Sequence, residues 1–138
     1  MVRTLKATTR TDEHVGEWQV TISADTLDAL FAEIARAIAR TGGPARGDYA
    51  DWEAISLSAP DTATLAVDWA NELIGRSEIH HRIYDDVRIA RLDDSTLTAD
   101  VRGRAAVMWR SPLKAATYHR LNLAHEDGRW RLTMLLDV

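Results

Sequence analysis

The chain has 138 residues, 46% of them apolar and 28% charged, so it is globular and long enough for one domain, residues 1–138, with a single core. It has no cysteine, no signal-peptide pattern and no run of ~18 apolar residues, which excludes a disulfide framework and a membrane span and predicts a cytoplasmic protein. Its net charge is −4, and residues 1–70 carry six Lys or Arg against eleven Asp or Glu, which excludes the basic footprint of a typical nucleic-acid binder.

The first half of the chain predicts a strand, a helix and a loop. Apolar and polar residues alternate over residues 18–22, which is the pattern of a half-buried strand. An apolar stripe with helical spacing follows over residues 27–38, and Asp25 is the predicted N-cap of this helix. The segment Gly42-Gly43-Pro44 ends it, because neither glycine nor proline continues a helix readily.

The remaining elements are a second helix and further strands. A strand is predicted at residues 52–57, and a helix begins near Asp61 and ends near residues 75–77. Further strands are predicted at residues 82–89, at residues 97–101 and in a hairpin at the end of the chain. This order predicts a two-layer α+β fold, a largely antiparallel sheet with two helices packed on one face.

The terminal hairpin allows a prediction of register. Asp127-Gly128 is the strongest turn signal in the chain, and a two-residue loop there pairs Leu123 with Leu132. The same register places Asp137 opposite Tyr118, on the face away from the apolar residues. A four-residue loop would shift each partner by two positions and keep the faces.

Two acidic segments are candidates for a binding site. Asp137 ends an apolar strand, so its carboxylate either anchors a hard cation or a basic partner, or bonds to a neighbouring loop. The segment 13–17, Glu-His-Val-Gly-Glu, either contributes oxygen ligands to Ca²⁺ or Mg²⁺ or is a polar surface loop. Trp109 either stacks on a base or partner surface or anchors a loop. Standard nucleophile, phosphate-loop and metalloprotease motifs are absent from the sequence, so no autonomous enzyme is indicated.

Five short motifs occur in order along nearly the whole chain. They are Glu13-His14-Val15-Gly16-Glu17, Ala24-Asp25-Thr26-Leu27-Asp28-Ala29-Leu30-Phe31, Trp69-Ala70-Asn71-Glu72-Leu73-Ile74, Lys114-Ala115-Ala116-Thr117-Tyr118-His119 and Leu135-Leu136-Asp137. Together they resemble the archease family. The family's pattern has an acidic residue followed by His-Thr-Ala-Asp, then Gly-x-Thr-Leu-x-x-Leu-Phe, Trp-Leu-Asn-Glu-Leu-Leu, Lys-Ala-x-Thr-Tyr-His and a near-terminal Ile-Leu-Asp.

The resemblance implies a small cytoplasmic protein that is not an enzyme. It would assist an RtcB-type RNA ligase in tRNA splicing and RNA repair, by promoting the ligase's guanylylation and repeated turnover. It would also bind a divalent metal, with Ca²⁺ expected and Mg²⁺ or another cation as alternatives, through Glu17 and Asp137, with Glu13 as a third ligand. The residues expected to contact the ligase are Lys114, His119 and His14.

The chain departs from the family pattern at its first motif. The motif's aspartate is Glu17, one methylene longer, and its Thr-Ala is replaced by Val15-Gly16. Calcium accepts either carboxylate, so metal binding is compatible with the change. The alternative hypothesis is a small-molecule-binding or interaction module that has diverged from ligase activation, with a tryptophan-lined apolar pocket between sheet and helices.

Overall fold

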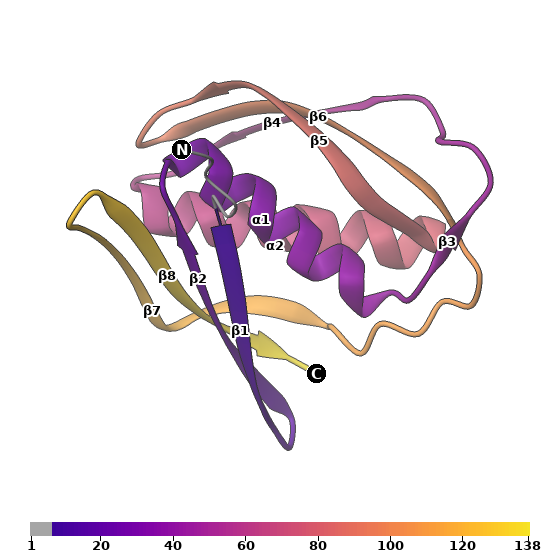
Figure 1. The fold of residues 1–138 in the computed structure, drawn as a ribbon, viewed down its shortest axis with the longest axis horizontal. Helices are drawn as coiled ribbons and strands as arrows, with labels where there is room; N and C mark the ends of the chain where they lie inside the picture. Colours follow the sequence, from indigo (N-terminus) through magenta and orange to yellow (C-terminus); the bar gives the residue numbers. More distant parts are fainter. Residues whose placement is uncertain (1–6) are drawn as a thin grey trace, which may run out of the picture.

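The computed structural model describes residues 7–138, which form two antiparallel sheets and two helices (Figure 1). The first sheet has the order β1-β2-β8-β7 and comprises Ala7–His14 (β1), Glu17–Ala24 (β2), Arg129–Asp137 (β8) and Ala115–Glu126 (β7). The second sheet has Thr96–Ala106 (β6) at its centre, with Arg82–Leu92 (β5) on one side and Glu53–Ser58 (β4) and Ala45–Arg46 (β3) on the other.

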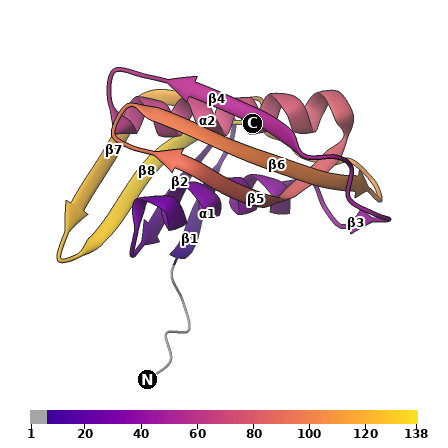
Figure 2. The same cartoon turned by 90° about the horizontal axis from the view of Figure 1, so that it is seen from above.

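Both helices, Leu27–Thr41 (α1) and Thr62–His80 (α2), lie between the two sheets (Figures 1 and 2). α1 contacts β1, β2 and β8 of the first sheet and β5 of the second, while α2 contacts β7, β4 and β5. The predicted α+β class is confirmed, but the single sheet with both helices on one face is wrong. α2 buries Leu65 and Trp69 on one side and Val67 and Ile74 on the opposite side, which one sheet could not cover.

The helix ends follow from local hydrogen bonds. α2 begins next to Asp61 as predicted, and Asp61 is its N-cap, since its carboxylate accepts a 2.7 Å hydrogen bond from the Thr64 amide. The N-cap of α1 is Thr26 rather than Asp25, because the Thr26 hydroxyl accepts from the Ala29 amide at 3.1 Å. The Asp25 carboxylate instead forms an ion pair with Arg129 of β8, which ties the start of α1 to the first sheet.

β1 is a strand that the sequence pattern did not reveal. Residues 13–17, considered as a polar loop before the first strand, form the tight end of a β1–β2 hairpin. Val15 and Gly16 make the turn, and Gly16 adopts φ 79°, a conformation that glycine reaches without strain. β1 lies at the edge of its sheet and is mostly exposed, so it lacks the apolar alternation by which strands are recognised.

The terminal hairpin is confirmed near its turn and wrong farther along. Asp127 and Gly128 form the turn with φ 53° and 73°, and Leu123 pairs with Leu132 as predicted. Asp137, however, faces Ala115 and not Tyr118. The register shifts between Thr117 and Asn122, where β7 contains an irregularity with Arg120 at φ 55°. The Tyr118 hydroxyl donates instead to Asp68 on α2.

The core fills the space between the sheets and around the helices. Trp69 of α2 is fully buried, and its indole N–H donates a 2.8 Å hydrogen bond to the Phe31 carbonyl of α1. This bond satisfies the polar group of the largest buried side chain and joins the two helices. Within residues 7–138, neither helix is long and apolar enough to cross a membrane.

Candidate functional site

Three side chains predicted from the sequence lie in one row across the first sheet. Glu17 is the direct cross-strand partner of Asp137 on β8 and of His14 on β1. Since side chains alternate along a strand and Val20 and Ile22 face the core, Glu17 points to the outer face of the sheet. We call His14, Glu17 and Asp137 the carboxylate row. It assembles residues from both ends of the chain.

The backbone around the carboxylate row is fixed by hydrogen bonds. The Lys114 amide donates to the Asp137 carbonyl at 2.9 Å, and the Val138 amide donates to the Gly16 carbonyl at 3.2 Å. The last residues of the chain are therefore held between β7 and the β1–β2 turn. This arrangement gives Asp137 a defined position, which a frayed terminus would not provide.

The two carboxylates of the row have no cationic partner among the described residues 7–138. Neither Glu17 nor Asp137 makes a side-chain hydrogen bond or ion pair within residues 7–138. Directly opposed residues on antiparallel strands have Cβ atoms about 5 Å apart, and like charges in such pairs destabilise the sheet. A cation bound between the two side chains would relieve this repulsion.

The donor set suits a shallow metal site better than a closed one. Two carboxylates offer up to four oxygen ligands, and both Ca²⁺ and Mg²⁺ complete such sets with water. Among residues 7–138, no group of three or more His, Cys, Asp or Glu side chains is arranged to hold a metal. A divalent cation held by Glu17 and Asp137 alone would have to keep most of its water ligands, and His14 is their neighbour on β1.

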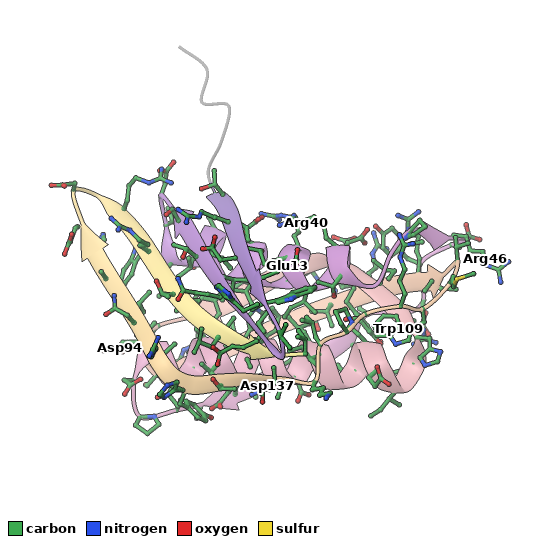
Figure 3. The ribbon with its side chains drawn as sticks, turned by 90° about the horizontal axis from the view of Figure 1, so that it is seen from below. Glu13, Arg40, Arg46, Asp94, Trp109 and Asp137 are labelled. Atoms are coloured by element: carbon green, nitrogen blue, oxygen red, sulfur yellow. The ribbon has the colours of Figure 1, made fainter. Side chains whose placement is uncertain are left out.

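Glu13 does not join the carboxylate row. It pairs with Trp18, so it points to the helix-facing side of the sheet, whereas Glu17 points outward. There it lines an open groove of about 230 Å³ between β1 and α1, together with Trp18 and Arg40 (Figure 3). The two-residue turn pairs Glu13 with Trp18 and His14 with Glu17. Glu13, the third ligand implied by the resemblance, therefore lies on the opposite face of the sheet from Glu17 and Asp137.

Lys114 and His119 lie on the other side of Asp137. Lys114 immediately precedes Ala115, the cross-strand partner of Asp137, and its exposed side chain lines an open groove of about 550 Å³ along the end of α2. His119 is exposed in the irregular part of β7, four residues beyond Ala115, which corresponds to about 13 Å along a strand. Only Lys114 is therefore close to the carboxylate row.

Trp109 is an anchor of its loop. Its ring stacks on His81 at 5.5 Å, its indole N–H donates to Glu78 at 3.0 Å, and a Cβ added at Gly42 would lie 2.7 Å from it. The apolar pocket that Trp18 lines with Val20, Ile22 and Ile34 has a volume of only about 40 Å³. Drug-sized ligands occupy about 300–1,000 Å³, so this space does not suit the tryptophan-lined pocket of the alternative hypothesis.

Two carboxylates on the inner side of the sheets, Glu33 and Glu53, are in contrast bonded to partners. Glu33 of α1 is 6% exposed and accepts hydrogen bonds from Thr9, Arg36 and Arg40. Burial alone would raise the pKa of its carboxyl, but the hydrogen bonds and positive charges of these partners hold the pKa below its ordinary value. Glu33 therefore stays charged and ties β1 to α1.

The second of these carboxylates, Glu53, lies on the second sheet and is bonded to α2. Glu53 of β4 accepts a 2.9 Å hydrogen bond from Arg76 and a 2.8 Å hydrogen bond from the hydroxyl of Tyr84. Burial of the phenol, together with its bond to Glu53, raises the pKa of Tyr84 to about 12.

The fold and the site define a class: a two-helix α+β protein that holds an acidic pair at the end of a sheet, where its last strand lies beside the turn of its first hairpin. The model of the Archease protein family (MTH1598/TM1083) matches residues 10–138. The chain therefore belongs to the archease family.

Curated relatives match over most of their length. The chain is 27% identical over 134 residues to the protein archease of Methanopyrus kandleri, a match that covers 91% of this chain and 96% of the relative. It is 23% identical over 137 residues to the protein archease of Methanosarcina acetivorans, covering 91% and 92% of the two chains.

Solved structures have the same fold. Protein 1598 of Methanobacterium thermoautotrophicum superimposes with a TM-score of 0.73 at 18% identity, covering 94% of this chain and 98% of that protein. An archease from Thermotoga maritima, described as a possible chaperone, gives a TM-score of 0.68 at 18% identity, covering 94% and 96%.

Proposed function

We propose that this chain activates an RtcB-type RNA ligase in tRNA splicing and RNA repair, as a metal-binding cofactor protein without catalytic activity of its own. It would act where such a ligase acts, in the cytoplasm, and promote guanylylation and repeated turnover of the ligase. Membership of the archease family supports the class of function. The observation that carries the proposal is the direct pairing of Glu17 with Asp137 on an exposed sheet face.

The acidic pair, Glu17 and Asp137, is the part of this surface that would hold a cation against the ligase. Its two carboxylates project outward and have no cation within residues 7–138, whereas Glu33 and Glu53 are neutralised by arginines. A divalent cation held there would supply positive charge to an acidic, nucleotide-binding surface of the ligase. The strands supply the rigidity, since backbone hydrogen bonds fix both sides of Asp137.

Neighbouring residues extend this surface in the proposal. Lys114 adds a cationic side chain next to the strand position that faces Asp137. His14 lies on the other side of Glu17, at the end of the β1–β2 hairpin that projects from the body of the protein in Figure 1. Val15 at the tip of this hairpin is fully exposed, so the hairpin can reach a partner without rearrangement. His119 lies about 13 Å farther along β7, so it is outside the immediate surroundings of the acidic pair.

The test is a guanylylation assay of the cognate ligase with the wild-type chain and with Asp137→Ala, each with and without a chelator. Stimulation by the wild-type chain should fall at least tenfold on chelation, and Asp137→Ala should give the chelated rate with or without added Ca²⁺. The matched control is Asp94→Ala, an exposed aspartate in the β5–β6 turn whose side chain has no partner within residues 7–138 (Figure 3).

The outcomes separate the parts of the proposal. Normal stimulation by Asp137→Ala would contradict the metal mechanism while leaving ligase activation intact. Absence of stimulation by the folded wild-type chain, with the ligase shown to be active, would contradict ligase activation itself. Equal losses in Asp137→Ala and Asp94→Ala would indicate a general effect of surface charge.

A further inference from the structure

A second charged region lies where the end of α1 meets the second sheet, on elements that do not form the carboxylate row. An open cavity of about 290 Å³ is found there. Three arginines line it, Arg36 and Arg40 from α1 and Arg104 from β6. The remaining lining residues are Ala39, Gly43, Pro44, Ala45, Ile83 and Asp85. We call this space the arginine cavity.

Two of the arginines are held in place from behind. Arg36 and Arg40 bind the buried carboxylate of Glu33 at 3.0 and 2.8 Å, and their side chains are still 48% and 56% exposed. A guanidinium carries five N–H donors, so each retains donors that Glu33 does not use. Glu33 thus orients both arginines and leaves part of each guanidinium available to a ligand.

Arg104 has an unmet hydrogen-bonding requirement. Its Nε is buried and has no hydrogen-bond partner within residues 7–138. Its contact with Asp85 is long, at 3.5 Å, and Asp85 also accepts a 2.8 Å hydrogen bond from the Tyr49 hydroxyl. Buried donors without an acceptor are rare in native proteins, so Arg104 indicates an acceptor that these residues do not supply.

The balance of charge in the arginine cavity is positive. Its three guanidinium groups face two carboxylates, Asp85 in the lining and Glu33 behind it, which leaves an excess of one positive charge. A further cation lies at the margin, because the Nε of Arg110 would be only 2.9 Å from a Cβ built on Gly43. The Arg110 side chain has no hydrogen bond or ion pair within residues 7–138. This local excess contrasts with the net charge of −4 of the chain.

We infer that the arginine cavity binds the phosphate group of a phosphomonoester of about nucleotide size. Planar guanidinium groups match phosphate oxygens in bidentate geometry, and three of them surround the space. The volume of about 290 Å³ is close to the lower limit of about 300 Å³ for small-molecule sites and exceeds what a bare phosphate fills. Ala39, Pro44 and Ile83 provide apolar contacts for the organic part of the ligand. The inference is independent of ligase activation.

Titration of the full-length protein with guanosine 5′-monophosphate, followed by calorimetry and amide NMR, tests the inference. The nucleotide should bind and shift the amide signals of Gly43 and Ala45, whereas guanosine without its phosphate should bind at least tenfold more weakly. A 5′-phosphorylated trinucleotide, compared with the same RNA lacking the phosphate, distinguishes an RNA end from a free nucleotide as the source of the phosphate.

Matched variants locate the binding. Arg36→Gln and Arg104→Gln should each weaken nucleotide binding at least tenfold. Arg88→Gln is the control, since Arg88 pairs with Asp100 and packs over Trp52 outside the cavity. Equal affinities in all three variants, or nucleotide binding without shifts at Gly43 and Ala45, would overturn the inference. If either cavity variant fails to fold, the NMR shifts of the wild-type chain and the guanosine comparison decide the question.

Discussion

Glu33 and Asp137 are both carboxylates beside the first sheet, yet their surroundings differ in every respect that sets the energy of a charge. Glu33 is buried on α1 and is surrounded by the hydroxyl of Thr9 and two arginines. Asp137 is exposed at the end of β8 and faces another carboxylate, Glu17. The buried carboxylate Glu33 is thus neutralised by ion pairs within α1 and joined to β1 through the Thr9 hydroxyl, whereas the exposed carboxylates Glu17 and Asp137 form no ion pair within residues 7–138.

The first prediction compares stability at the two positions. Glu33→Ala removes a buried acceptor of three hydrogen bonds, two of them charged, and should lower the free energy of unfolding by about 2–3 kcal/mol. The side chain of Asp137 has no partner in the described part of the chain, so Asp137→Ala should change the free energy of unfolding by less than about 0.5 kcal/mol. Urea denaturation of both variants measures the difference. Similar decreases in the free energy of unfolding of the two variants would contradict the view that Glu33 stabilises the fold and Asp137 does not.

The second prediction concerns Glu53 and Glu17, which should respond with opposite signs. Glu53→Gln weakens the bonds to Arg76 and Tyr84 and should lower the free energy of unfolding by about 1–2 kcal/mol. Glu17→Gln removes repulsion from Asp137 and should raise it by about 0.2–0.5 kcal/mol in the absence of metal. Denaturation in the presence of a chelator gives both values. A loss of stability in Glu17→Gln would indicate that the opposed carboxylates do not repel.

The sequence could predict those parts of the fold that depend on local signals. The apolar stripe of α1, the cap at Asp61 and the Asp127-Gly128 turn specify their own structure through short-range interactions. The cross-strand partner of Asp137 on β7 could not be predicted from local signals. The register of β7 shifts at residues 118–121, and no glycine, proline or other turn residue marks that position in the sequence. The division of the strands into two sheets is likewise a matter of tertiary packing.

The candidate site shows the same limit. The resemblance to a family pointed to Glu17 and Asp137, and the register of β2 with β8 then showed that they are opposed. The sequence misplaced Glu13, because β1 was not recognised and the face of each residue in a hairpin depends on the length of its turn. The one local signal was Gly16, a turn residue directly before the alternating residues 18–22, but the polar segment that precedes it has no strand pattern. The arginine cavity had no signal, since its residues come from distant segments.

The third prediction is the response of the interior carboxylate to acid. The pKa of Glu33 is lowered in the folded protein, so its contribution to stability is present above the ordinary value of 4.5 and is lost as the pH falls through the lowered pKa. Glu33→Gln should therefore lose less stability than the wild-type chain on acidification below about pH 4.5. Thermal unfolding across this range measures it. Parallel curves for the two proteins would contradict the role of Glu33.

The fourth prediction concerns the phenol bonded to Glu53. Burial, with the bond to Glu53, raises the pKa of Tyr84 from 10 to about 12, so its contribution to stability is present below pH 10 and is lost as the pH rises towards 12. Tyr84 should be the last of the three tyrosines to ionise in the folded chain. Ultraviolet titration of the wild-type chain and of Tyr84→Phe isolates its signal. Loss of the first rather than the last ionisation step in the variant would contradict this assignment.

The smallest predicted effect is at the position where this chain departs from its family pattern. Glu17→Asp shortens the side chain by one methylene and leaves fewer rotamers to be fixed on binding, which corresponds to about 0.5 kcal/mol. If the acidic pair holds a divalent cation, Glu17→Asp should bind Ca²⁺ roughly two- to threefold more tightly, as measured by calorimetry, and Glu126→Asp in the exposed terminal hairpin should leave the affinity unchanged. A loss of tenfold or more in Glu17→Asp would mean that the longer side chain is needed to reach a cation that Asp137 holds farther from the sheet. In that case glutamate at position 17 would be the residue whose length matches the distance between the two strands, since the register already places the backbones of Glu17 and Asp137 directly opposite each other.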